Sequence, residues 1–136
     1  MDVAEALAFV REHHHAVLAT MRADGRPQLS PVACGVDRDG MVVVSTRETA
    51  MKTKNLRREP WCSLCVFTDR FFGPFVQIEG PVEIVELPDA MGHLVEYYRS
   101  VAGEHPDWDD YRAAMERERR VMLRVRPERV GPSRSG

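Results

Sequence analysis

The sequence predicts a mainly β protein of the β+α type, a small barrel with peripheral helices. Through the first two-thirds of the chain, short apolar runs alternate with tight turns, two of which carry the pairs Asp24-Gly25 and Asp39-Gly40. The run Met41–Val44 is rich in β-branched residues, and Phe75–Val85 alternates apolar and polar side chains. Several short antiparallel strands joined by tight turns are typical of a small barrel.

The length and charge of the chain limit its class. A chain of 136 residues is one domain, which we expect to cover 1–130, with 131–136 as a flexible tail. The formal net charge of −2 does not favour nucleic acid as a partner. The N-terminus lacks the pattern of a signal peptide, and no apolar run approaches the ~20 residues of a membrane span. We therefore expect a soluble, cytoplasmic protein without nucleic-acid or membrane partners.

Apolar spacing and turn residues predict the order of the elements. Helical spacing occurs at 2–13, 50–58, 88–103 and 107–118. Strands are predicted at 16–21, 28–36, 41–44, 61–67, 75–85 and 121–125. Pro31 places its strand at a sheet edge or bulge, and Gly80-Pro81 predicts a bulge or bend in the long strand. The polar segment Ser45–Thr49 predicts a turn before the second helix.

The three cysteines predict neither a disulfide scaffold nor a metal site. Cys62 and Cys65 match the C-x-x-C spacing, but residues three apart on a strand point to opposite faces. No second Cys or His pair is spaced to complete a zinc site. We therefore expect ordinary buried thiols and no metal.

The helix predicted at 50–58 is basic. Its cations are Lys52, Lys54, Arg57 and Arg58. If Thr49 is the N-cap, Lys52 lies in the first turn, where its charge opposes the helix dipole unless an anion docks there. Free backbone N–H groups, cap hydroxyls and a lysine together make a phosphate site. The alternative is a solvated basic face.

No set of side chains indicates catalysis by the protein alone. The chain lacks the G-x-S-x-G, H-E-x-x-H, P-loop and G-x-G-x-x-G motifs. Ser30 and Ser45 have no His and acid partners at recognisable spacing. A small barrel with a phosphate-binding helix and no acid–base set suits a protein whose cofactor performs the chemistry.

Four segments taken together resemble a known family. They are Leu18–Thr20, Asp24–Val32, Lys52–Pro60 and Glu79-Gly80. In order and spacing they resemble the pyridoxamine 5′-phosphate oxidase-like split-barrel superfamily. Tyr98–Arg112 is similar to its actinobacterial branch of probable F420-dependent enzymes, and the oxidases of vitamin B6 metabolism do not share this segment.

The resemblance implies a six-stranded split β-barrel that forms a homodimer, with FMN or the deazaflavin coenzyme F420 bound in grooves at the dimer interface. Carried onto this chain, the phosphate contacts are Lys52 and Asn55, supported by Lys54, and then Ser45 and Thr46. Gln28 and Ser30 are implied at the edge of the ring system. The acidic tail of F420 suits the helix cations, Arg57 among them.

This chain departs from the family pattern in three ways. Where the relatives have a basic residue two positions before the helix lysine, this chain has Ala50, and Arg47 is the candidate to substitute. A tryptophan expected near Gly73 is absent, with Phe71 and Phe72 nearby, a pair that suits a core plug, an oligomer contact or a ligand lid. The chain is also much shorter than the vitamin B6 oxidases, so their reaction is not assigned.

Three hypotheses for the function follow. The preferred one is a dimeric oxidoreductase that binds reduced F420 and transfers hydride to an unknown small-molecule acceptor. The second is an FMN-binding flavoprotein of the same fold. The third is a non-catalytic carrier of a flavin or deazaflavin, which the lack of acid–base residues keeps open.

Overall fold

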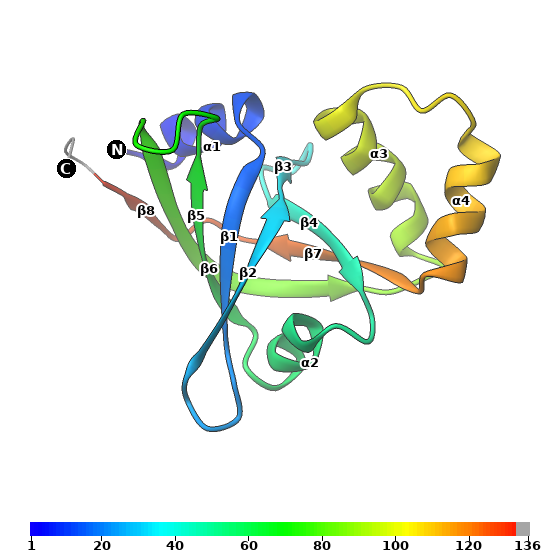
Figure 1. The fold of residues 1–136 in the computed structure, drawn as a ribbon, viewed down its shortest axis with the longest axis horizontal. Helices are drawn as coiled ribbons and strands as arrows, with labels where there is room; N and C mark the ends of the chain where they lie inside the picture. Colours follow the sequence, from blue (N-terminus) through cyan, green and yellow to red (C-terminus); the bar gives the residue numbers. More distant parts are fainter. Residues whose placement is uncertain (133–136) are drawn as a thin grey trace.

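The computed structural model describes residues 1–132, in which four helices surround eight strands (Figure 1). The helices are α1 (Val3–Glu12), α2 (Met51–Arg58), α3 (Ala90–Ala102) and α4 (Trp108–Arg117). The strands are β1 (His15–Met21), β2 (Pro27–Ala33), β3 (Gly35–Val36), β4 (Val42–Arg47), β5 (Trp61–Phe67), β6 (Phe75–Val85), β7 (Arg120–Val125) and β8 (Arg129–Gly131). The predicted β+α barrel with peripheral helices is confirmed.

The strands pair antiparallel in the order β2-β1-β5-β6-β7-β4-β3, and β8 pairs with β6. Six of them have six residues or more and correspond to the six strands of the expected split barrel. The two additions, β3 and β8, have two and three residues. Such short runs carry too few residues for an alternation signal, so the sequence does not reveal them.

The long strand β6 belongs to both halves of the barrel. It pairs with β5 as far as Pro81 and with β7 from Val82 onward. The change of partner falls directly after Gly80-Pro81, where the sequence predicts a bulge or bend. The chain after β7 crosses at the same point, where Arg126 N donates to Pro81 O at 3.0 Å and Glu128 N donates to Glu79 O at 3.0 Å. A glycine is required at position 80 because a Cβ there would overlap the carbonyl oxygen of Arg126.

Two boundaries predicted from the sequence are wrong. Ser45–Thr49 was expected to be a turn, but β4 continues through Arg47, because this polar end pairs with β7 as far as Arg120. The strand expected over 28–36 is interrupted at Cys34, which separates β2 from β3. The placement of Pro31 is confirmed, since β2 is an edge strand of the order.

The C-terminal boundary also differs from the expectation. Gly131 was assigned to a flexible tail, but it is the last residue of β8 and pairs with Gln77 of β6. Residues 133–136 of that predicted tail lie outside the described part of the chain. The domain therefore extends at least to the end of β8.

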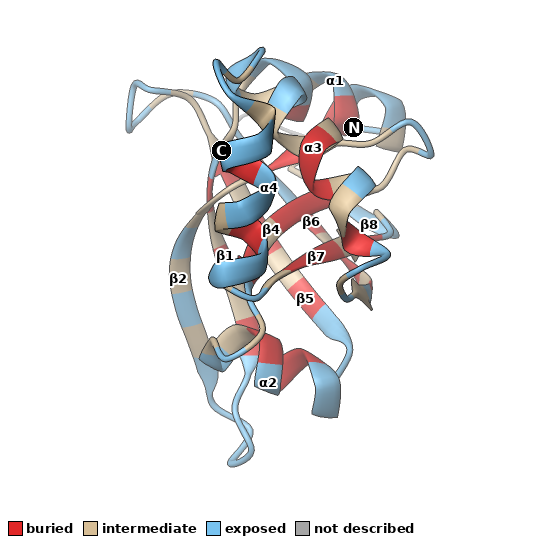
Figure 2. Cartoon of the chain, turned by 90° about the vertical axis from the view of Figure 1, so that its right-hand side faces the viewer, coloured by how far each residue is buried: buried red, intermediate tan, exposed pale blue. Residues whose placement is uncertain are grey.

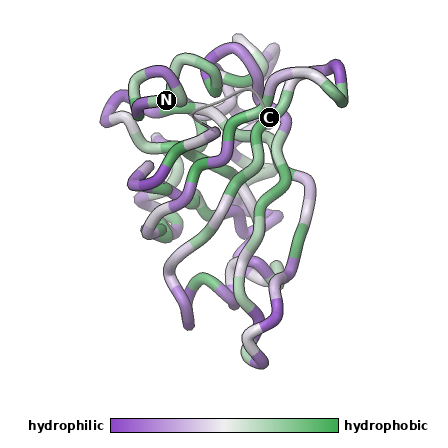
Figure 3. The backbone as a smooth tube through the Cα atoms, turned by 90° about the vertical axis from the view of Figure 1, so that its left-hand side faces the viewer, coloured by the Kyte–Doolittle hydropathy of each residue, from purple (hydrophilic) through white to green (hydrophobic). Residues whose placement is uncertain are grey.

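The buried apolar residues form two cores. The larger fills the barrel, with Leu18, Leu64 and Ile78 among its fully buried side chains. The smaller lies between the sheet and the α3–α4 hairpin, and Figure 2 shows the buried parts of β4 and β7 behind these helices. Figure 3 shows, from the opposite side, hydrophobic stretches along the strands and hydrophilic ones toward the turns. Helices α3 and α4 thus cover one face of the sheet.

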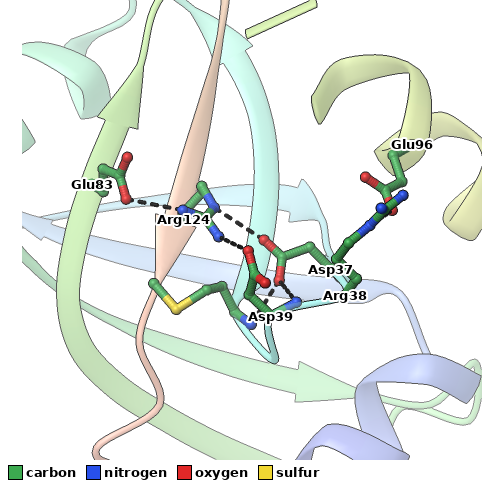
Figure 4. Close-up of polar contacts among 7 residues, drawn as sticks. Asp37, Arg38, Asp39, Glu83, Glu96 and Arg124 are labelled. Atoms are coloured by element: carbon green, nitrogen blue, oxygen red, sulfur yellow. Dashed lines mark hydrogen bonds and ion pairs between the residues drawn. The ribbon is translucent and has the colours of Figure 1, made fainter. Parts of the chain in front are cut away.

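Arg124 of β7 ties three segments together through carboxylates (Figure 4). Its guanidinium contacts Asp37 at 3.0 Å, Asp39 at 2.9 Å and Glu83 at 3.0 Å. The side chains of Arg124 and Asp37 are only 12% and 8% exposed, and Asp37 also accepts the backbone N–H groups of Asp39 and Met41. Because every charge in this group has a partner, it holds the β3–β4 turn against β6 and β7.

The predicted burial of the thiols holds for Cys34 and Cys62 and only in part for Cys65. All three are free, Cys62 is buried, and Cys65 on the opposite face of β5 is half-buried. Burial raises the pKa of the Cys34 and Cys62 thiols to about 12, with Glu79 adding to the effect at Cys62. Within residues 1–132 no three metal-ligating side chains gather into a site. No helix in the same range has the length and apolar character needed to cross a membrane.

Candidate functional site

Helix α2 begins without a side-chain cap. The N-cap is Ala50, so the interpretation of Thr49 as the cap is wrong. The start of the helix is instead held by the backbone carbonyl of Arg47. This oxygen accepts hydrogen bonds from Ala50 N at 3.1 Å and from Thr53 Oγ1 at 2.7 Å. Lys52 still lies in the first turn, which contains no acid. The positive end of the helix dipole therefore lacks a compensating side chain of its own.

Cations from three elements surround this helix start. Arg47 ends β4 and lies directly across from Arg120, the first residue of β7. Glu118 joins both: it accepts Arg120 Nε at 3.1 Å and Nη2 at 2.9 Å, and it lies 3.6 Å from Arg47 Nη2. We call Arg47, Lys52, Arg120 and Glu118 the basic cluster, which carries three positive charges and one negative charge.

Lys52 is the unpaired member of the basic cluster. Within residues 1–132 it forms no ion pair, and the same is true of Lys54. Burial lowers the pKa of the Lys52 amine, and the nearby charge of Arg120 lowers it further. Both effects disfavour the protonated amine, and the charge of a bound anion would oppose them. The positive charge of Lys52 is therefore available to a ligand.

Asn55 has a different environment from Lys52. It is 2% exposed, and its Nδ2 donates to Thr20 Oγ1 at 3.1 Å. Thr20 Oγ1 in turn donates to Gln28 Oε1 at 3.3 Å. Arg58 Nη2 donates both to Asn55 Oδ1 at 3.2 Å and to Met21 O at 2.7 Å. This chain of hydrogen bonds fastens α2 to β1 and β2 and positions Gln28.

The remaining predicted residues are spread over two faces. Ser45 shares a face of β4 with Arg47, whereas Thr46 is buried on the other face. Ser30 shares the inward face of β2 with Gln28, and its Oγ is buried without a hydrogen-bond partner among residues 1–132. Arg57 contacts Glu86 at 2.6 Å, beyond the C-terminal half of the helix. Lys52 and Ser45 thus lie on the cluster side, while Asn55, Gln28 and Ser30 form a second group.

The sequence does not reveal Arg120 and Glu118 as members of the site. They lie more than 60 residues from Lys52 along the chain, in a turn and strand start without a motif. Only the pairing register of β4 with β7 brings them beside Arg47. The paired arginines in that register are a signal that could be found only after the strand pairing was known.

The strand order and the short basic helix together define a split β-barrel. The chain belongs to the pyridoxamine 5′-phosphate oxidase family, whose model matches residues 3–133. The resemblance stated from the sequence is thereby confirmed at the level of the family.

Solved structures with the same fold include proteins to which different functions, or none, are assigned. A conserved hypothetical protein from Mycobacterium tuberculosis is 28% identical with a TM-score of 0.77, and the match covers 100% of this chain and 92% of that one. An F420 reductase is 23% identical with a TM-score of 0.69, covering 91% and 94% of the two chains. The heme storage protein of Vibrio cholerae is 19% identical with a TM-score of 0.69, covering 96% and 94%. The last two similarities establish the fold alone.

The residues present fit an anionic cofactor. The basic cluster has two more positive than negative charges, and its lysine has no acidic partner within residues 1–132. The buried Oγ of Ser30 is a polar atom without a partner in the same range. A phosphate with an attached polar ring system has the charge and the hydrogen-bonding groups that such residues require.

Proposed function

We propose that this protein is an F420-dependent oxidoreductase that acts on a small-molecule acceptor. The observation that carries the proposal is the unpaired Lys52 at an uncapped helix start, beside Arg47 and Arg120. When bound, the coenzyme supplies hydride transfer, which agrees with the lack of an acid–base set in the sequence. The fold it shares with an F420 reductase supports the same choice.

In this proposal the side chains bind and orient the coenzyme. Lys52 donates to the phosphate, with Lys54 and Ser45 in support. Gln28, fixed by Thr20, and Ser30 meet the polar edge of the ring. Thr46 and Asn55 stay as predicted phosphate contacts, with Asn55 also anchoring the helix to β1.

The choice between F420 and FMN depends on the tail of the coenzyme. FMN has one phosphate and needs only the basic cluster, whereas F420 adds a long acidic tail. Arg57 and Lys54 lie on α2 beyond the cluster, and Arg57 would have to leave Glu86 to meet such a tail. Because the Arg57–Glu86 pair is exposed, exchanging its carboxylate costs little. FMN is the second candidate because it uses the same cluster.

The proposal includes a homodimer with the coenzyme at its interface. The outward face of β1, β2, β5 and β6 exposes Leu29, Trp61 and Phe75. Phe71 and Phe72 on the neighbouring loop are 76% and 90% exposed, so they do not plug the core of their own chain. An exposed apolar surface of this kind is typical of an oligomer contact. Sedimentation equilibrium is expected to give twice the 15.5 kDa chain mass, and a monomer at micromolar concentration would contradict the dimer.

The proposed function is tested by titrating the purified protein with F420, FMN and heme in parallel, with fluorescence or absorbance as the readout. We expect F420 to bind more tightly than FMN, and affinity to fall with added salt because exposed charges are screened. Tighter FMN binding would favour the flavoprotein, and binding of heme alone would exclude both. A panel of electrophilic acceptors with the reduced coenzyme then separates an enzyme from a carrier.

A further inference from the structure

Arg120, which β7 brings to the basic cluster, is fixed in orientation. Arg120 donates to Glu118 through both Nε and Nη2, so two bonds hold the plane of its guanidinium. Its Nη1 group has no hydrogen-bond partner in residues 1–132. Both side chains are 27% exposed, so the guanidinium is partly removed from water while one donor group stays free.

The ion pairs of the cluster do not balance its charge. Arg47 and Arg120 share the single carboxylate of Glu118, and Lys52 has no acid of its own within residues 1–132. Like charges placed side by side in a half-buried site raise its electrostatic energy. Two unbalanced positive charges match a phosphate monoester, which carries about −1.5 to −2 at pH 7.

We propose that Arg120 is an anion-binding residue of this site, acting with Lys52 on the phosphate of the coenzyme while Glu118 fixes its orientation. The inference rests on the function proposed above, but it concerns the phosphate alone. It also makes strand β7 part of the cofactor site, although the helix motif alone does not include that strand. Free phosphate has the same chemistry as the ester, so the test includes both.

The test compares Arg120→Met with wild type in binding of FMN, riboflavin and inorganic phosphate. Riboflavin lacks only the phosphate, so the ratio of the two flavin affinities isolates the phosphate contact. We expect the variant to lose about tenfold in FMN affinity, to leave riboflavin unchanged, and to lose the thermal stabilisation that phosphate gives the wild type. Arg117→Met removes the same charge from an exposed position of α4 and should change none of these values.

A second readout follows from the charge of Lys52. The charged group that acts on its amine is Arg120 from β7, whose own carboxylate partner is Glu118. As pH rises, Lys52 loses its proton below the ordinary lysine value of 10.5, and phosphate binding weakens. Removing Arg120 takes away one cause of the lowered pKa of Lys52, so phosphate binding should begin to weaken at a higher pH in the variant. This shift reports the charge of Arg120 near Lys52, whereas the FMN-to-riboflavin ratio reports its contact with the phosphate.

The outcomes separate this inference from the proposed function. An unchanged FMN-to-riboflavin ratio and unchanged phosphate binding in Arg120→Met would overturn the role of Arg120, even if F420 binds the wild type. Phosphate binding that is lost in the variant would support the role even if no coenzyme binds, and the proposed function alone would then fail. If Arg120→Met does not fold, Arg120→Lys is the second variant. It keeps the positive charge but loses the planar set of N–H donors of the guanidinium, and the same comparison applies.

Discussion

Replacing Lys52 with alanine is expected to weaken the binding of F420 about 10- to 100-fold. A charge-assisted hydrogen bond to phosphate contributes roughly 1.5–3 kcal/mol, and the loss of one such bond sets this range. Lys52 is the right residue to test because it lies in the first turn of α2 without an acidic partner in residues 1–132. Fluorescence titration of the wild type and the variant measures the effect.

Lys54→Ala is the matched comparison, since it removes the same charge from the same helix at an exposed position. We expect a smaller loss, because exposed charges contribute less than half-buried ones. Equal losses in the two variants would show that α2 attracts the coenzyme only through its total charge. No loss in Lys52→Ala would remove Lys52 from the site.

The Lys52→Ala variant should not lower the stability of the protein. Burial, and then Arg120, place the pKa of Lys52 in the folded state below its value of 10.5 in the unfolded chain. The protonated amine therefore opposes folding, and this opposition fades as pH rises through the folded-state pKa. At neutral pH we expect an unchanged or slightly raised melting temperature for Lys52→Ala. A functional residue that does not stabilise the fold is typical of a binding site.

Replacing Gly80 with alanine is expected to destabilise the barrel by about 3 kcal/mol or more. The added Cβ would overlap the Arg126 carbonyl oxygen and lie 2.9 Å from the carbonyl carbon of the same residue. The neighbour is backbone, held by hydrogen bonds from Arg126 to Pro81 and from Glu128 to Glu79, so it cannot turn aside. Thermal unfolding should show a melting temperature lower by roughly 10 °C.

Gly92→Ala is the control for this prediction. Gly92 lies in α3, and a Cβ at this position would meet no atom within 4 Å. Alanine is a better helix former than glycine, so the control should raise stability by about 0.5–1 kcal/mol. If Gly80→Ala unfolded at the wild-type temperature, the crossing of the chain over β6 would have to be looser than described.

Local patterns in the sequence were sufficient to predict most of the fold. The alternation in Phe75–Val85 and the apolar run of Trp61–Phe67 are properties of single segments, and both strands have the predicted bounds. The end of β4 could not be predicted in this way, because Ser45–Arg47 is polar and is held as a strand by its pairing with β7. Long-range pairing decided the structure wherever a local pattern was weak.

The residue pattern by itself predicts only the part of the candidate site on α2, while Ser45, Thr46, Gln28 and Ser30 follow from the family resemblance. The sequence identifies Lys52 through its place in a basic helix with no acid in the first turn. It gives no means of finding Arg120, which reaches the site through the register of two strands. The same limit applies to the hydrogen bond between Asn55 and Thr20, which joins residues 35 positions apart.

The central place of β7 in the sheet has a consequence for synthesis of the chain. β7 lies between β6 and β4, so both of these strands keep an unpaired edge until residues 120–125 have left the ribosome. Exposed strand edges invite pairing with other chains. The earlier strands therefore stay incompletely paired until residues 120–125 have been synthesised, and the barrel closes only when β7 joins them.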